Sequence, residues 1–285
     1  MPAPFESRTL AAEGLSLHLR QRHAVGSPAV LFLHGWLDHS HSFDPLLEYL
    51  PAHWHVGLLD FRGMGRSGHA PLGASYQFGD HLLDVEAALD GLGLESAHLV
   101  GHSLGGIVAL AYAAARPARV KSVSLIESLG PRGGPAEGAV GRLRGFLEDS
   151  RRPPNRKRYP TVEAAAARLR ENTPSLPESA ALLLARHGTQ PHPEGGLTFT
   201  FDPRQRRRFG HGFDEAQWLA IEATVTCPVQ LIRGSEGLLP DSSWLHSRMA
   251  ALSTLAQPPL VLPGGHHVHM EQPEATARAL AAFIA

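Results

Sequence analysis

One serine stands where its neighbours favour nucleophilic chemistry. Ser103 lies in the pentapeptide Gly101-His102-Ser103-Leu104-Gly105, within the stretch LVGHSLGGIVALAY at 99–112. The pattern G-x-S-x-G between a strand-like and a helix-like run predicts a tight strand-to-helix turn, in which bulky residues at 101 or 105 would collide with adjacent elements. Such a turn presents the hydroxyl at the carboxyl edge of a sheet, beside helix N–H groups that favour a developing anion. We therefore expect Ser103 to be a nucleophile; a serine that only caps its helix is the alternative.

A general base is available near the end of the chain. A serine hydroxyl is a poor nucleophile without a base, and LPGGHHVHMEQPE at 262–274 offers His266, His267 and His269 after the last predicted strand. A histidine pair that binds a metal ion is the alternative. A metal site would need a carboxylate or a third histidine converging on the pair, and the sequence identifies none. We therefore expect no metal and no cofactor.

The elements that must position these residues follow an alternating pattern. Short apolar runs bounded by Gly, Pro or charge predict strands buried on both faces of a parallel sheet, and the segments between them have helical spacing. The runs are 28–35, 55–60, 96–102, 120–127, 227–234 and 258–265. Strand–helix alternation favours an open α/β sheet, while the polar–apolar alternation over 8–22 predicts an exposed antiparallel edge. The pattern breaks between about 129 and 215. We expect 129–215 to be a mainly helical cap inserted into a core formed by 1–128 and 216–285.

The amino-acid composition argues against several classes of binding partner. The 26 basic and 27 acidic residues create no overall field that would favour nucleic acid or an anionic membrane. The basic run RRPPNRKR lacks interleaved aromatic residues and is typical of a solvated face. A single cysteine, Cys227, forms no internal disulfide, and we find neither a signal-peptide core nor 18 consecutive apolar residues. The sequence predicts a cytoplasmic protein that acts on a small molecule, without nucleic-acid or membrane partners.

Four motifs together resemble the ordered landmarks of the α/β-hydrolase superfamily. They are FLHGW (32–36), DFRGMGRS (60–67), GHSLGG (101–106) and GGHHVHMEQP (264–273). The resemblance implies a mostly parallel central sheet flanked by helices, with the cap inserted before the last two strands. It maps the base onto His266, and it adds the backbone N–H of Trp36 to that of Leu104 as the oxyanion hole. The G-x-G-x-x-G match at 63–68 has no helix after it, so we do not expect a dinucleotide site.

The acid that should orient the histidine is missing from its usual place in this superfamily, where Gly237 stands in LIRGSEGLLPD. Glu236 lies one position early, and Asp241 lies further on, where helix capping is its alternative role. Glu127 ends the strand that follows the helix of Ser103. An acid at this position resembles the arrangement in haloalkane dehalogenases, which are members of the same superfamily. A carboxylate at the end of a buried strand needs a partner, which could be protonated His266 or an arginine of the insertion. We expect Glu127 to be the acid.

A narrower resemblance, to the serine hydrolase-like proteins, rests on HGWLDHSHSFDPLL, LLLARHGTQPHPEGGLTFTFDPRQR and GGHHVHM. Together these patterns predict a serine esterase with a Ser103–His266–Glu127 triad and an acyl-enzyme intermediate. A lactonase, a thioesterase and a C–C bond hydrolase are alternatives within the same class. A ligand-binding protein of this fold with little turnover is the alternative from another class. We also expect cap residues at 143–147 and 182–184 to influence the choice of substrate.

Overall fold

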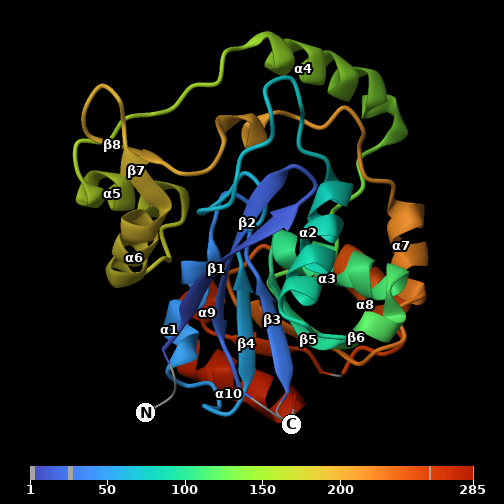
Figure 1. Ribbon diagram of the computed structural model, residues 1–285. Coiled ribbons are helices and arrows are strands. Elements are labelled where there is room, and N and C mark those ends of the chain that lie inside the picture. Colours follow the sequence, from blue (N-terminus) through green and yellow to red (C-terminus); the bar gives the residue numbers. More distant parts are fainter. Residues whose placement is uncertain (1–3, 25–27, 257, 285) are drawn as a thin grey trace.

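An eight-stranded sheet forms the centre of the computed structural model, which describes residues 4–24, 28–256 and 258–284 (Figure 1). The strand order is β1-β2-β4-β3-β5-β6-β9-β10. The strands are β1 (Glu6–Ala12), β2 (Leu15–Arg22), β3 (Ala29–Leu33), β4 (His55–Leu59), β5 (Ala97–His102), β6 (Val120–Ile126), β9 (Val229–Gly234) and β10 (Leu260–Leu262).

The six strands from β4 to β10 in this order pair in parallel, whereas β1 and β2 join the sheet antiparallel at one edge. All five residues of β3 and all five of β4 are buried, as expected for parallel strands covered on both faces. The predicted fold class and the antiparallel edge are confirmed. The strand at 258–265 differs from the prediction, because β10 is a short edge strand with Leu260 and Val261 exposed.

Helices cover both faces of the sheet, and Figure 1 shows α2, α3, α7 and α8 on one side and α1, α9 and α10 on the other. The α-helices of this part are α1 (Asp44–Leu47), α2 (Phe78–Gly91), α3 (Leu104–Ala115), α7 (Glu215–Ala223), α8 (Ser243–Ala251), α9 (Val268–Glu271) and α10 (Pro273–Ile284), with 3₁₀ turns η1 (Ser40–Phe43) and η2 (Pro117–Arg119). Successive strand residues serve opposite faces: Leu31 packs in the cluster that contains Val108 of α3, and Phe32 in the cluster that contains Leu280 of α10. No described helix is both long and apolar enough to cross a membrane.

Residues 129–215, which we call the inserted segment, lie between β6 and β9. The segment contains α4 (Ala139–Arg151), α5 (Val162–Asn172) and α6 (Glu178–Gly188), the two-stranded sheet of β7 (Thr189–Pro191) and β8 (Leu197–Phe199), and the 3₁₀ turns η3 (Ala136–Gly138) and η4 (Pro203–Arg206). Helices α5 and α6 share a small core of Ala165, Leu176 and Ala181 that also contacts Met270 of α9. Figure 1 shows α4 well apart from this pair.

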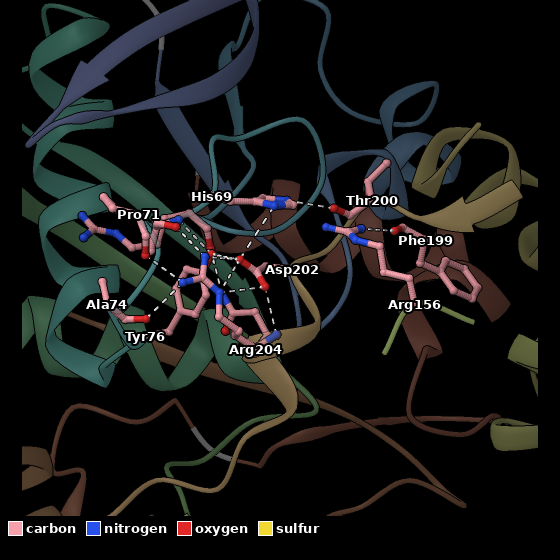
Figure 2. A network of polar contacts seen from close by, with 12 residues as sticks. His69, Pro71, Ala74, Tyr76, Arg156, Phe199, Thr200, Asp202 and Arg204 are labelled. Carbon is pink, nitrogen blue, oxygen red and sulfur yellow. Dashed lines mark hydrogen bonds and ion pairs between the residues drawn. The ribbon is translucent and has the colours of Figure 1, made fainter. Parts of the chain in front are cut away.

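A polar network attaches the inserted segment to the loop between β4 and α2 (Figure 2). Arg204 donates to the carbonyl oxygens of Ala70, Pro71 and Ala74, and it also pairs with the buried carboxylate of Asp202. The Tyr76 hydroxyl donates to that carboxylate at 2.8 Å. Because these contacts join residues far apart in the sequence, they fix turn η4 against the core.

Candidate active site

Ser103 occupies a strained turn between β5 and α3. Its backbone φ of 50° and ψ of −115° lie in a region that residues with a Cβ rarely adopt. Hydrogen bonds on both sides hold this conformation: Ser103 N donates to Ile126 O at 3.0 Å, and Ser128 Oγ donates to Ser103 O at 2.8 Å. The fixed backbone keeps the side chain at the carboxyl end of the parallel strands.

The flanking glycines are required by close packing. A Cβ on Gly105 would lie 2.0 Å from the carbonyl oxygen of Leu33, and a Cβ on Gly101 would lie 2.4 Å from the carbonyl of Gly105. Both distances are far inside van der Waals contact. The collisions expected from the sequence at 101 and 105 are therefore present.

Glu127 follows the last residue of β6 and lies beside His266. The Oε2 atom of Glu127 is 3.4 Å from His266 Nδ1 and accepts a hydrogen bond from Leu238 N at 2.7 Å. The other oxygen, Oε1, accepts from Gly234 N at 2.7 Å. The Glu127 side chain is fully buried, and its ion-pair partner is His266 rather than an arginine of the inserted segment. Two backbone donors and one imidazole thus satisfy a carboxylate that is shielded from water.

Gly237 leaves the space that this carboxylate fills. A Cβ built on Gly237 would lie 2.2–2.3 Å from the carboxylate atoms of Glu127. The two other acids considered from the sequence lie elsewhere: Glu236 is exposed, and the exposed Asp241 pairs with His246 at 2.8 Å. The capping role considered for Asp241 is wrong, because Ser242 Oγ caps α8 by accepting from Leu245 N.

Ser103 and His266 line one cavity of about 380 Å³. The inserted segment contributes part of its wall, including Leu184 of α6. Of the two stretches expected to influence substrate choice, 182–184 therefore reaches the cavity. The stretch 143–147 does not line this cavity: Leu143 and Leu147 are exposed on α4 and Phe146 lines a separate hollow. Its influence on substrate choice stays a prediction.

The loop after β3 approaches the serine closely. A Cβ on Gly35 would lie 3.4 Å from Ser103 Cβ, so the Gly35–Trp36 backbone runs directly against the turn. The Trp36 indole is 52 % exposed and lines the cavity, and its Nε1 donates to Gln205 O at 3.2 Å. Trp36 and Leu104 also line a second, apolar cavity of about 260 Å³. The indole is therefore a wall between two cavities and not an ordinary packed core residue.

Three further histidines surround His266. The ring of His102 lies 4.7 Å from that of His266 and 4.3 Å from that of His269, and His102 Nε2 is 2.9 Å from the carbonyl oxygen of His266. Burial, and then neighbouring imidazoles, hold the pKa of His102 and His269 well below the ordinary value and lower the pKa of His267 to about 4. These rings are therefore neutral at pH 7, and that of His102 contacts the His266 backbone through its carbonyl oxygen.

Sequence reasoning missed part of this histidine group. His269 lies fully buried in α9, where its ring contacts that of His102, and His102 was not considered as a site residue. The available signal was the polar residue at the carboxyl end of β5, directly before Ser103. Asp38 was missed as well: it lines the cavity, and its buried Oδ2 has no hydrogen-bond partner within the described chain.

Other motifs do not form binding sites. The glycine-rich turn at 63–68 is followed by an irregular loop, and α2 begins only at Phe78, so the helix N-terminus required by a pyrophosphate is missing there. Within the described ranges, one group has metal-ligand spacing: His41, Asp44 and His187. The His41 and His187 rings stack at 3.7 Å, and Arg20 pairs with Asp44 at 2.7 Å. Lone pairs in two stacked ring planes do not converge on one ion, so these contacts are better explained as an ion-pair cluster.

Comparisons with known proteins agree with this architecture. The family model described as the alpha/beta hydrolase fold matches residues 28–273. A serine hydrolase-like protein of Danio rerio is 29% identical over 272 residues, which cover 90% of this chain and 81% of that protein. A 2-(acetamidomethylene)succinate hydrolase of Mesorhizobium japonicum is 28% identical over 98% of this chain and 95% of its own length.

Solved structures give the same result. The crystal structure of a hypothetical protein from Pseudomonas aeruginosa PAO1 superposes with a TM-score of 0.88 at 33% identity and covers 99% of both chains. A match of this extent includes the sheet, its helices and the inserted segment. With the turn at Ser103 and the family match over most of the chain, these findings show that the protein belongs to the α/β-hydrolase family, in its serine hydrolase-like branch, and is a hydrolase.

Proposed function

We propose that this protein is a serine hydrolase that cleaves a carboxylic ester, or a related acyl bond, of a small molecule. One observation carries the proposal: the strained Ser103 turn and His266 face the same cavity, and His266 Nδ1 lies beside the buried carboxylate of Glu127. A strained nucleophile, a base and an orienting acid are the parts that acyl transfer requires.

In the first half of the reaction, Ser103 Oγ attacks the acyl carbon while His266 Nε2 accepts the hydroxyl proton. Glu127, held in place by the N–H groups of Gly234 and Leu238, orients the imidazole and stabilises its protonated form. The backbone N–H groups of Trp36 and Leu104 bind the oxyanion. The tetrahedral intermediate collapses, His266 gives its proton to the departing alkoxide, and an acyl-enzyme remains on Ser103.

In the second half, water attacks the acyl-enzyme while His266 accepts one of its protons. The second tetrahedral intermediate releases the carboxylic acid and returns the proton to Ser103. The residues supply nucleophile, base and oxyanion donors without a cofactor. Esters are the favoured substrates because an alkoxide leaves more readily than an amine.

We further propose that the inserted segment, residues 129–215, acts as a cap over the site. Its α5, α6 and β8 contribute residues to the cavity that contains Ser103, and the Arg204 network holds it against the core. Residues that close a cavity over the nucleophile decide which acyl groups fit. Substrate choice is therefore assigned to this segment, and the chemistry to the core.

The test combines active-site labelling with a panel of 4-nitrophenyl esters of graded acyl length. We expect the wild-type protein to react with a fluorophosphonate probe at Ser103 and to hydrolyse esters. Ser103→Ala should lose both the labelling and the turnover, with unchanged circular dichroism and Tm. Ester hydrolysis that survives in Ser103→Ala would place the nucleophile elsewhere. Ligand binding without labelling or turnover in the wild type would favour the binding-protein alternative.

A further inference from the structure

The wall that the inserted segment gives to the catalytic cavity carries positive charge. Arg168 of α5 and Arg206 at the end of η4 both line the cavity, together with Tyr159 and Asn172. Basic residues are numerous throughout this segment, but most of them do not line the cavity. These two share the cavity with Ser103 and His266, where their charge meets whatever occupies it.

Among the described residues, Arg206 has an aromatic neighbour but no compensating acid. Its guanidinium lies over the ring of Phe201 at 4.7 Å, and no carboxylate of the described chain lies within ion-pair distance of it. The acid nearest in sequence, Asp202, is already bound by Arg204 and Tyr76. The network in Figure 2 holds the turn that ends at Arg206 against the core, so the backbone that carries this charge has a fixed position. Within the described ranges the charge has no acidic partner.

Arg168 is available for a second contact. Its only acidic partner in the described residues is Glu171, at 2.6 Å, and the side chain of Glu171 is 63% exposed. An exposed ion pair of this kind contributes little to stability, so a bound anion can replace it at small cost. Both arginines act on Tyr159: burial raises the pKa of its phenol, and the charges of Arg168 and Arg206 oppose that rise. Tyr159, Arg168 and Arg206 thus share the lining of one cavity.

The acidic residue of the cavity lining does not cancel these charges. Asp38 comes from the loop after β3, on the core side of the cavity, whereas both arginines belong to the inserted segment. Burial raises the pKa of the Asp38 carboxyl. Within the described lining, two guanidinium groups thus face one carboxyl group, which leaves an excess of positive charge.

We propose that the substrate is the half-ester of a dicarboxylic acid, whose free carboxylate binds Arg206 and Arg168 while its ester carbonyl lies at Ser103. The inference rests on the proposed function and names its substrate class. A guanidinium presents paired N–H donors that match the two oxygens of a carboxylate. The Tyr159 hydroxyl and the Asn172 amide add neutral donors on the same wall.

The experiment compares two esters that differ only at the far end of the acyl chain: 4-nitrophenyl hemiadipate, which ends in a carboxylate, and 4-nitrophenyl hexanoate, which ends in a methyl group. After subtraction of the uncatalysed rate, we expect kcat/KM to be about tenfold or more higher for the hemiadipate at low salt. The preference should fall as salt is added, because salt screens partly exposed charges.

Substitutions with matched controls locate the charge. Arg206→Gln should lower kcat/KM for the hemiadipate by about 10- to 100-fold, the usual range for a lost hydrogen bond to a charged group, and change the hexanoate by less than about threefold. Arg168→Gln should act in the same direction, but less. Arg207→Gln and Arg170→Gln remove the same charge from neighbours that do not line the cavity and should leave both rates unchanged.

The outcomes separate this inference from the proposed function. Hydrolysis of the hexanoate without preference for the hemiadipate, or equal effects of Arg206→Gln and Arg207→Gln, would overturn the inference and leave the esterase intact. If neither ester is hydrolysed, the proposed function fails. Calorimetric titration with adipate then decides the anion site separately. Binding to Ser103→Ala protein that is lost in Ser103→Ala/Arg206→Gln supports the site, and no binding to Ser103→Ala overturns it.

Discussion

Glu127 and Gly237 compete for one space, and exchanging their roles tests the acid assignment. The Glu127 carboxylate accepts from Gly234 N, Leu238 N and the His266 ring, so its two oxygens carry three donors. In Glu127→Gln one oxygen becomes an NH₂ group that cannot accept. Wherever the amide oxygen points, at least one buried N–H loses its acceptor, at a cost of about 1–3 kcal/mol in stability.

The catalytic loss in Glu127→Gln should be larger than the structural one. The amide oxygen of the substituted side chain can still accept from His266, but the side chain carries no charge to stabilise the imidazolium. Replacement of the acid by an amide in a well-studied serine protease lowers turnover by about 10⁴-fold, and a correct tautomer preserved here would reduce that figure, so we expect about 10²- to 10⁴-fold. The same change at Glu236, and Asp241→Asn, should cost less than about threefold by comparison.

Two glycine substitutions extend the test. In Gly237→Ala the new Cβ would lie 2.2 Å from the Glu127 carboxylate, so the carboxylate must move, and turnover should fall by about 100-fold. Gly79→Ala is the matched control, because nothing lies within 4 Å of a Cβ at that position. Glu127→Gly removes the side chain and suits the local φ of 49°. Glu127→Gly/Gly237→Asp, which returns an acid to the superfamily's usual position, should recover about tenfold or more relative to Glu127→Gly.

The assay is ester hydrolysis at saturating substrate, with Tm measured for each variant so that unfolding is not mistaken for lost chemistry. Full activity in Glu127→Gln, together with a large loss in Glu236→Gln or Asp241→Asn, would refute the assignment of the acid. Additive losses in the double variant, with no recovery, would show that positions 127 and 237 do not serve the same histidine.

Two other predictions concern the histidines. His266→Ala should lose turnover to an extent similar to Ser103→Ala, because members of a triad act as a unit, whereas His267→Ala should cost much less; the opposite ranking in kcat would identify His267 as the base. The folded-state pKa of His267 is about 4, below its ordinary 6.5, so the unfolded chain binds more protons between these values. The contribution of His267 to stability should be complete above pH 6.5 and lost as pH falls towards 4, by on the order of 1–3 kcal/mol. Urea unfolding of His267→Gln should show a shallower decline over that window than the exposed-site control His53→Gln, and parallel declines would contradict the burial argument.

The sheet could be predicted from sequence because buried parallel strands have a recognisable pattern, a short and nearly continuous run of apolar residues. β3 and β4 are buried at every residue, and the runs at 28–35 and 55–60 carry that signature. The prediction of a buried strand at 258–265 was less accurate, because β10 lies at the edge of the sheet. An edge strand is covered less, so its apolar residues stay exposed, and a hydrophobic run alone does not reveal which strand lies at the edge.

The cavity wall could not be predicted in the same way. Arg168 and Arg206 lie in the inserted segment among many other arginines, and their sequence neighbours Arg170 and Arg207 look the same in composition. What brings Arg206 to the cavity is the position of turn η4, which depends on the contacts of Arg204 with a loop about 130 residues away. What brings Arg168 there is the packing of α5 against α6. Local sequence patterns do not predict contacts between residues so far apart in the chain. The α4 stretch at 143–147 was expected at the site for a related reason. A helical pattern predicts which side of a helix is apolar, but not which part of the protein that side packs against.

The displaced acid shows how a missing residue can be informative. β6 lies between β5 and β9, with Ile126 opposite His102 on one side and Ile232 on the other. Residues that follow β6 and β9 therefore emerge at the same edge of the sheet, and Glu127 N donates to Ile232 O at 2.9 Å. Two positions far apart in sequence thus reach one point in space. An acid after β6 needs an empty volume after β9, and glycine is the residue that leaves it. In this chain, the carboxylate of Glu127 can occupy its position only because residue 237 has no side chain.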